Sequence, residues 1–400
     1  MTTQSNSASI EPSAVANGDS SATFPGLSVL HVILCLDPGG LERVVIDLTR
    51  EAAGVGQTAS ILCIEKPGVL APQAQSVTKL YCSAKGPGLS WAVVDRIRSL
   101  LKELRPDVVH THQISALFYL APISRKLTPI LVHTEHNNQF RRYQTFREKF
   151  TYFSMLAAAG PRVDRMFAVS EDARQSILNS HVIPRRKLFT VPNGINFDRF
   201  RLREPDLTLR KSLGIPDDSF VFGNIGRLTE MKRPDILIDA FAKLSAEFPA
   251  SHLLLVGDGP LMVELRNQAA TLKIADRVHF TGFQPKPEQY LGMLDVFVLT
   301  SRMEGMPLAV LEASASGIPV IASKVGGLEE MSDGGRSILL YEFGDMDALL
   351  SGLRRLASQS DYRQRLAQAG REHVLTAYAA KRMARDYAHH YTQIKQIQAR

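Results

Sequence analysis

Two glutamates in the second half of the chain have the type and spacing of residues that hold a carbohydrate. The string Ser301-Arg-Met-Glu-Gly-Met-Pro-Leu-Ala-Val-Leu-Glu312 places seven residues between Glu304 and Glu312. Each carboxylate can accept paired hydrogen bonds from vicinal hydroxyls, which a sugar or a ribose offers. Gly305 lets the backbone approach a ligand, and free N–H groups at a helix start bind hydroxyl or phosphate oxygens. The string therefore predicts a sugar or ribose site, against the plainer interpretation of a capped helix with solvated acids.

Two cations follow a glycine at the end of another apolar run. The segment Gly226-Arg-Leu-Thr-Glu-Met-Lys232 offers the guanidinium of Arg227 and the ammonium of Lys232. A rigid guanidinium fork and a point-charge ammonium together suit a diphosphate. The alternative is a solvated basic loop. We interpret the segment as a diphosphate clamp because of its place after a predicted strand.

A glycine turn near the start of the chain is a third candidate. In Asp37-Pro-Gly39-Gly40-Leu-Glu-Arg43 two glycines lead into an amphipathic stretch. The start of a helix there could approach a diphosphate from the other side. The segment Gly257-Asp-Gly259-Pro260 lacks a third glycine, so it is not the dinucleotide-binding fingerprint.

Four histidines raise a rival hypothesis. His110 and His112 lie two apart on a predicted strand and face the same way, while His133 and His136 follow the next strand. Such a group could bind zinc, which leaves a zinc-dependent hydrolase as an alternative function. We favour instead a contact of His112 with a sugar hydroxyl or the reacting centre.

Alternating strand and helix patterns predict a doubly wound α/β fold in both halves. Nearly continuous apolar runs are typical of strands buried on both faces of a parallel sheet. Ligands of such sheets bind at the carboxyl ends of the strands, so two sheets would share a central cleft. The expected strands cover residues 28–36, 59–64, 107–112, 130–133, 166–169 and 187–191, then 220–225, 253–256, 278–281, 296–300 and 319–322, with helices between them, 115–126 and 307–316 included.

Composition limits the remaining classes of protein. The chain has 400 residues, 44% hydrophobic and 22% charged, which is ordinary for globular domains and too long for one core. Residues 1–27 are expected to form a disordered leader, and no apolar run is long enough to predict a transmembrane helix. Three cysteines without metal-binding spacing, Cys35, Cys63 and Cys82, favour a reducing cytoplasm.

The positive charge is concentrated in the first half. Residues 28–197 hold 21 lysines and arginines against 13 acids, out of a net charge of +7 for the chain. Such an excess indicates an anionic partner, either phosphate groups or an acidic membrane. No nucleic-acid-binding module is recognisable, so no nucleic acid is expected.

The ordered set of motifs resembles glycosyltransferase family 4. It comprises the glycine turn from Gly39, His110-Thr-His112, Ala168-Val-Ser-Glu171, Val191-Pro-Asn-Gly194, the Arg227/Lys232 segment, Gly257-Asp-Gly-Pro260, the two-glutamate string and Gly326-Gly327. The resemblance implies a GT-B fold: two Rossmann-like domains, an acceptor domain at residues 28–197 and a nucleotide-sugar domain at 198–384. It also implies that residues 385–400 form a helix crossing back to the first domain.

The resemblance implies retaining transfer from a UDP- or GDP-sugar to a saccharide or lipid-linked acceptor, in the making of a cell-surface polysaccharide or glycolipid. Arg227 and Lys232 would hold the diphosphate, Glu304 the sugar, Glu312 the ribose, and His112 the reacting sugar. The full expected set comprises His112, Glu304, Arg227 and Lys232 as catalytic residues; Gly39, Gly40, Gly226, Thr281, Gly305, Met306, Pro307, Leu308 and Glu312 as further donor-binding residues; and His110 and His136 on the acceptor side.

No cofactor or metal is expected, because the two cations can stabilise the leaving diphosphate. Asp345-Met-Asp347 has the spelling of a metal-binding pair, but it follows Gly344 and opens a helix, which predicts a helix cap. Within the same fold, a nucleotide-sugar epimerase is the alternative. A non-catalytic sugar-nucleotide sensor is a third class.

The stretch 140–156 alternates aromatic and basic residues. It predicts either an interfacial helix on an anionic membrane, reaching a lipid-linked acceptor, or an amphipathic helix with its aromatics in the core. With the first interpretation, the protein would be cytoplasmic and peripheral at the inner face of the plasma membrane.

Overall fold

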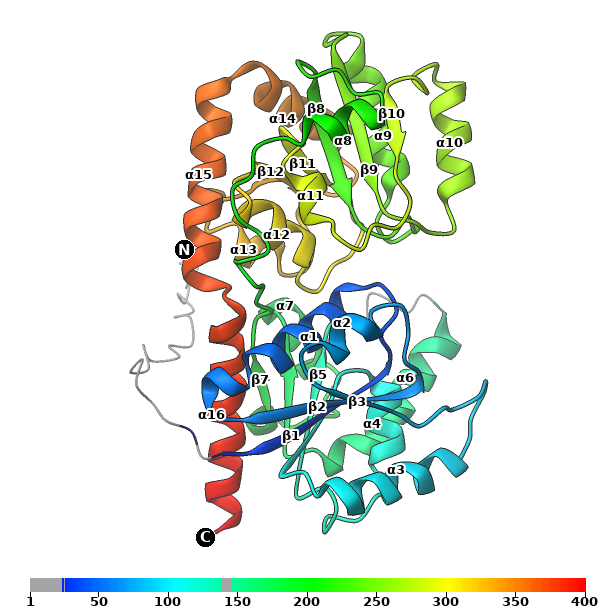
Figure 1. Cartoon of the computed structure of the whole chain (residues 1–400), viewed down its shortest axis with the longest axis vertical. Coiled ribbons are helices and arrows are strands. Elements are labelled where there is room, and N and C mark those ends of the chain that lie inside the picture. Colours follow the sequence, from blue (N-terminus) through cyan, green and yellow to red (C-terminus); the bar gives the residue numbers. More distant parts are fainter. Residues whose placement is uncertain (1–23, 25, 138–144) are drawn as a thin grey trace, which may run out of the picture.

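The computed structural model describes residues 24, 26–137 and 145–400. The expected leader, residues 1–27, falls almost wholly outside this part of the chain. The described residues form two α/β domains, one above the other in Figure 1. Each is built on a sheet whose paired strands are all parallel. The prediction of two doubly wound sheets is therefore confirmed.

The N-terminal sheet has seven strands in the order β3-β2-β1-β4-β5-β6-β7. Its strands are β1 (Ser28–Cys35), β2 (Thr58–Lys66), β3 (Lys79–Cys82), β4 (Val108–Thr111), β5 (Ile130–Glu135), β6 (Arg165–Ala168) and β7 (Leu188–Thr190). Its helices are α1 (Gly40–Glu51), α2 (Ala71–Gln75), α3 (Ala92–Leu104), α4 (Ile114–Leu120), α6 (Phe146–Ala159) and α7 (Glu171–Leu178), with short 3-10 turns at Ala53–Val55, Gly160–Arg162 and Arg185–Lys187.

The C-terminal sheet has six strands in the order β10-β9-β8-β11-β12-β13. Its strands are β8 (Phe220–Ile225), β9 (Ser251–Val256), β10 (Val278–Phe280), β11 (Val296–Leu299), β12 (Val320–Ser323) and β13 (Leu339–Tyr341). Its helices are α8 (Leu207–Ser212), α9 (Pro234–Ser245), α10 (Met262–Thr271), α11 (Glu288–Leu291), α12 (Leu308–Ala315), α13 (Leu328–Met331), α14 (Met346–Ser358) and α15 (Ser360–Ala377), and α16 (Ala380–Gln398) follows.

The differences from the expected elements have local causes. The short edge strands β3 and β13 were not expected, because neither stands out as an apolar run. The helix expected over residues 115–126 ends at Leu120. Pro122 explains this, since proline has no N–H and its ring clashes with the preceding helical turn.

The last helix belongs spatially to the first domain. In Figure 1, α15 runs along the upper domain and α16 continues down beside the lower sheet. The crossing lies next to the first linker: Ile195 N–H donates to Tyr378 O (2.9 Å), and Ala380 N–H donates to Ile195 O (2.9 Å). The crossing helix thus begins at Ala380, before the expected residue 385.

The domains share one apolar cluster. It contains β1 residues such as Val29, interface residues Met306 and Leu308, and Tyr387 of α16. Burial of this kind is the main favourable contribution to folding. Among the residues that the structure describes, no helix is both long enough and apolar enough to cross a bilayer.

Candidate active site at the domain interface

A carboxylate and an ammonium form the centre of the site. Lys232 lies in the loop after β8, and Glu304 lies in the loop after β11, its neighbour in the sheet. Lys232 Nζ donates to both oxygens of Glu304, at 2.6 and 2.8 Å. Glu304 is nearly buried, whereas Lys232 is partly exposed. The two residues expected to hold a diphosphate and a sugar therefore bind one another in this state.

Backbone contacts fix these two loops. Thr300 Oγ1 donates to the carbonyl oxygens of Lys232 (3.2 Å) and Arg233 (2.7 Å), and Arg302 N–H donates to Met231 O (2.9 Å). Because these hydrogen bonds join the two loops, the backbone that carries Lys232 and Glu304 is held in place. Such preorganisation is what charge stabilisation in an active site needs.

The second expected cation, Arg227, stands on the same edge of the sheet. The glycine loop beside it is packed closely: a Cβ at Gly257 would overlap Gly226 O, and Leu228 N–H donates to Asp258 O (2.9 Å). Gly257 has φ +139°, which L side chains rarely adopt. The side chain of Arg227 is exposed, and among the described residues its guanidinium has no hydrogen-bond or ion-pair partner. Its guanidinium is available to a ligand.

Glu312 has a partner that the sequence did not indicate. Arg43 of α1, in the other domain, reaches it with Nη1 3.4 Å from Oε1. Glu312 is buried, and this burial raises the pKa of its carboxyl, while Arg43 and Arg199 oppose the rise. The residue expected at the ribose thus also links the two domains.

Two helix starts meet at the interface. Helix α1 begins at Gly40 and α12 at Leu308, and a Cβ at Gly40 would lie 3.7 Å from the Leu308 side chain. The free N–H groups at both starts carry partial positive charge. The carboxyl of Glu42 folds back over Gly39, where burial raises its pKa to about 7, opposed by the charge of Arg227. This end of α1 therefore already holds an acidic group.

The loop that carries Glu304 lies against the N-terminal domain. A Cβ at Gly305 would overlap His136 O, and one at Gly326 would overlap Glu304 O. Asn193 Nδ2 donates to Met306 O (3.1 Å). Met306, Pro307 and Leu308, expected to bind donor, are buried in this contact. Their side chains pack between the domains.

Thr281 and Asp345 occupy the places predicted for them in the secondary structure. Thr281 directly follows β10, half-buried, and its hydroxyl donates to Gly282 O (2.9 Å). Asp345 caps α14, accepting from Ala348 N–H (2.9 Å). The helix-cap interpretation of Asp345 is confirmed.

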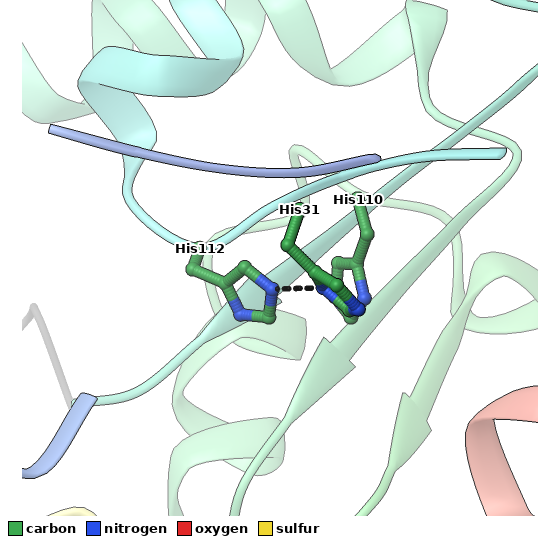
Figure 2. Close-up of side chains that lie close together, drawn as sticks. All are labelled: His31, His110 and His112. Atoms are coloured by element: carbon green, nitrogen blue, oxygen red, sulfur yellow. Dashed lines mark hydrogen bonds between the residues drawn. The ribbon is translucent and has the colours of Figure 1, made fainter. Parts of the chain in front are cut away.

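The histidines form a different group from the expected one. Figure 2 shows His31, His110 and His112 together, with His31 Nδ1 2.9 Å from His112 Nε2. The other nitrogen of His112, Nδ1, is 3.1 Å from His136 Nε2. All four rings are buried. With both nitrogens of His112 engaged by histidines, a contact with a sugar hydroxyl would require an exchange of partners.

His133 lies apart from this group. It pairs in register with Thr111 rather than His110, so it faces the opposite side of the sheet, where its Nδ1 is 2.9 Å from Thr111 Oγ1. His110 has hydroxyl partners on both nitrogens, Tyr391 and Thr134, each at 2.7 Å. The four-histidine zinc site of the hydrolase alternative is therefore not assembled. His31, which replaces His133 in the group, was missed because a lone histidine in a strand gives no signal by itself.

The aromatic and basic stretch is divided between core and surface. Residues 140–144 lie outside the described part. In α6 the buried side chains include Tyr152 and Leu156, whereas Phe146 and Phe150 are 84% and 63% exposed. The expectation of aromatic side chains in the core thus holds for Tyr152, while Phe146 and Phe150 lie on the surface.

Comparison with known proteins gives consistent results. Residues 38–199 match the family model described as Glycosyltransferase Family 4, and residues 206–373 match that of glycosyl transferases group 1. The UDP-Gal:alpha-D-GlcNAc-diphosphoundecaprenol alpha-1,3-galactosyltransferase of Escherichia coli is 32% identical over 64% of this chain and 68% of its own. The D-inositol 3-phosphate glycosyltransferase of Streptomyces avermitilis is 32% identical over 87% and 82%.

Solved structures share the architecture. Anabaena HepE in complex with UDP and glucose has a TM-score of 0.79 at 20% identity, covering 91% of this chain and 98% of that one. Sucrose-phosphate synthase from Thermosynechococcus elongatus has 0.79 at 21%, covering 93% and 100%. These likenesses establish the GT-B fold. Taken with the relatives above, they identify the chain as a glycosyltransferase that belongs to family 4.

Proposed function

We propose that this glycosyltransferase moves a sugar, with retention of its anomeric configuration, from a UDP- or GDP-sugar to a saccharide or lipid-linked acceptor. The product would be a cell-surface polysaccharide or glycolipid, as the names of the relatives suggest. The observation that carries the proposal is the Lys232–Glu304 pair, which faces the interface together with the starts of α1 and α12.

The charges of the site suit this reaction. As the sugar leaves, negative charge grows on the diphosphate, and fixed cations help most where charge develops. Arg227 and Lys232 would take the diphosphate, and Glu304, released by Lys232, would accept sugar hydroxyls. Glu312 would accept ribose hydroxyls in exchange for Arg43. The acceptor would attack from the face that the diphosphate leaves, with a phosphate oxygen taking its proton.

The test is turnover of UDP-, GDP- and ADP-sugars, with and without added saccharide acceptors. Lys232→Ala is expected to lower kcat/KM by about 10- to 100-fold, the worth of a charge-assisted hydrogen bond. Lys243→Ala, an exposed lysine on α9, is the matched control. Recovery of an isomerised nucleotide-sugar in place of a glycoside, as an epimerase would give, or no turnover of any donor, would overturn the proposal.

We propose that the reaction needs no metal ion. Arg227 and Lys232 would supply the positive charge that stabilises the leaving diphosphate, which is the role a divalent ion would otherwise take. Full activity after dialysis against EDTA is the expected result. Strict dependence on added Mg²⁺ or Mn²⁺ would refute this part of the proposal.

We also propose that the protein acts on the cytoplasmic side and touches an anionic membrane through the start of α6. Phe146 and Phe150 are one helical turn apart with stacked rings (6.3 Å between centroids), and Arg147 and Lys149 beside them are exposed. Exposed aromatic and basic side chains together favour an acidic bilayer surface. Co-sedimentation with phosphatidylglycerol vesicles should fall on replacing both phenylalanines by serine. Val263→Ser, an exposed residue of α10, is the control.

A further inference from the structure

Three imidazoles lie in a hydrogen-bonded row beneath the domain interface. His31 Nδ1 is 2.9 Å from His112 Nε2, and His112 Nδ1 is 3.1 Å from His136 Nε2. The first of these contacts is the dashed line in Figure 2. The three rings come from β1 and from the residues that follow β4 and β5. The row therefore runs from the centre of the sheet to a loop.

Sheet register explains why His31 joins this row. His31 on β1 pairs with His110 on β4, so both side chains point to the same face, and His112 is two residues further on. His110 stacks on His112 with 4.0 Å between ring centroids, and Tyr391 and Thr134 hold His110 by its two nitrogens. The ring of His112 thus stacks on one histidine and forms hydrogen bonds with two others.

The protons in this row must be ordered. Burial lowers the pKa of His31 and of His136 to about 3 and that of His112 well below its usual value, so all three rings are neutral at pH 7. A neutral imidazole has one N–H and one lone pair. Because His112 uses both nitrogens within the row, its two hydrogen bonds run in the same direction.

One end of the row decides the direction. Nδ1 of His136 is buried and has no hydrogen-bond partner within the described residues. A buried N–H without an acceptor is rarer in proteins than an unfilled acceptor, because N–H groups are nearly always paired. The favoured order has His136 Nε2–H donating to His112 Nδ1 and His112 Nε2–H donating to His31 Nδ1. It leaves a lone pair on His136 Nδ1.

This end of the row lies at the interface. His136 is in contact with Gly305, next to Glu304, because a Cβ at Gly305 would overlap His136 O. We propose that His31 is a positioning residue that fixes the tautomers of His112 and His136, so that His136 Nδ1 accepts a hydrogen bond from a substrate hydroxyl. The proposal rests on the glycosyltransferase function proposed above and adds a residue to it.

The first test needs no substrate. In the full-length protein with ¹⁵N-labelled histidine, two-bond ¹H–¹⁵N spectra distinguish the two neutral tautomers of His112. The expected form is Nε2–H in wild type and in His31→Asn, whose amide oxygen can still accept. In His31→Leu the acceptor is gone and each tautomer of His112 leaves one N–H unpaired, so His112 should change from a single tautomer to a mixture of the Nε2–H and Nδ1–H forms. An Nδ1–H tautomer in wild type, or no change in His31→Leu, would overturn the proposal whether or not any donor is turned over.

The second test uses the nucleotide-sugar that the donor screen identifies. His31→Leu should lower kcat/KM by about three- to tenfold, the worth of one neutral hydrogen bond, whereas His31→Asn should stay near wild type. His133→Leu, which removes an equally buried histidine from the opposite face, is the control for lost packing. If His31→Leu and His133→Leu lost activity equally, at equal melting temperatures, the result would show that His31 has only a structural role.

Discussion

Removal of the positive charge of Arg43 should destabilise the protein, because Arg43 pairs with the buried Glu312 of the other domain. The Arg43→Met change would leave the carboxylate of Glu312 buried without its nearest cation, since the two side chains are only 15% and 5% exposed. Breaking a buried ion pair on one side costs about 3–5 kcal/mol. Arg199 still faces Glu312, so the expected loss is about 3 kcal/mol, at the lower end of that range.

The loss should depend on pH in a defined direction. Burial already raises the pKa of Glu312 above its ordinary value of 4.5, and loss of Arg43 raises it further. A carboxyl with a raised pKa in the folded state favours folding below its unfolded pKa and loses that contribution as the pH rises through the folded value. The difference between Arg43→Met and wild type should therefore be small at acid pH and largest at neutral pH.

Scanning calorimetry at several pH values measures both effects. At about 2–4 °C per kcal/mol for a domain of this size, the C-terminal domain should melt about 6–12 °C lower at pH 7.5. Arg43→Met combined with Glu312→Gln should return close to wild type, because no charge is left buried. Arg354→Met, which breaks an exposed pair with Glu247, is the control. A shift of Arg43→Met no larger than that of the control, or equal shifts at acid and neutral pH, would refute the reasoning.

Three further outcomes are expected. Arg227→Ala should lower kcat/KM by about 10- to 100-fold without changing the melting temperature, because the side chain is exposed, and a near-normal rate would exclude the diphosphate clamp. The affinity of the wild type for UDP or GDP should fall above pH 7, because the Glu42 carboxyl beside Gly39 then becomes negatively charged; its pKa is raised to about 7 by burial, although Arg227 opposes the rise. In calorimetric titrations, Glu42→Gln should bind the nucleotide equally well across that pH range. Gly305→Ala should raise the radius of gyration in X-ray scattering and weaken nucleotide binding, since its Cβ would overlap the carbonyl oxygen of His136, and an unchanged radius would contradict this account of the interface.

The expected strands and their loops were readable because long apolar runs define buried parallel strands. Lys232 and Glu304 each lie in the loop after such a run, and neighbouring parallel strands end on one edge of a sheet. Their closeness therefore follows from local patterns and one rule of topology. That they would bind one another in this state does not follow, because the pattern says nothing about which groups are paired before a ligand arrives.

Contacts between the two domains could not be predicted from the sequence. Arg43 and Glu312 are 269 positions apart, and nothing local in either segment depends on the other. The histidines show a similar limit within one domain. Closeness in sequence grouped His133 with His110 and His112, but the register of β5 against β4 turns it to the opposite face. His31 joins them only because β1 lies beside β4, an order that the sequence alone did not provide.

The return of α16 to the first domain has a consequence for how the protein is made. Tyr387 and Tyr391 are fully buried, and Tyr391 bonds His110 in the sheet. Domains generally fold in order as they leave the ribosome. Here the first domain to be translated stays without part of its core until α16 emerges. A nascent chain stalled before residue 380 should accordingly expose an apolar surface and attract chaperones.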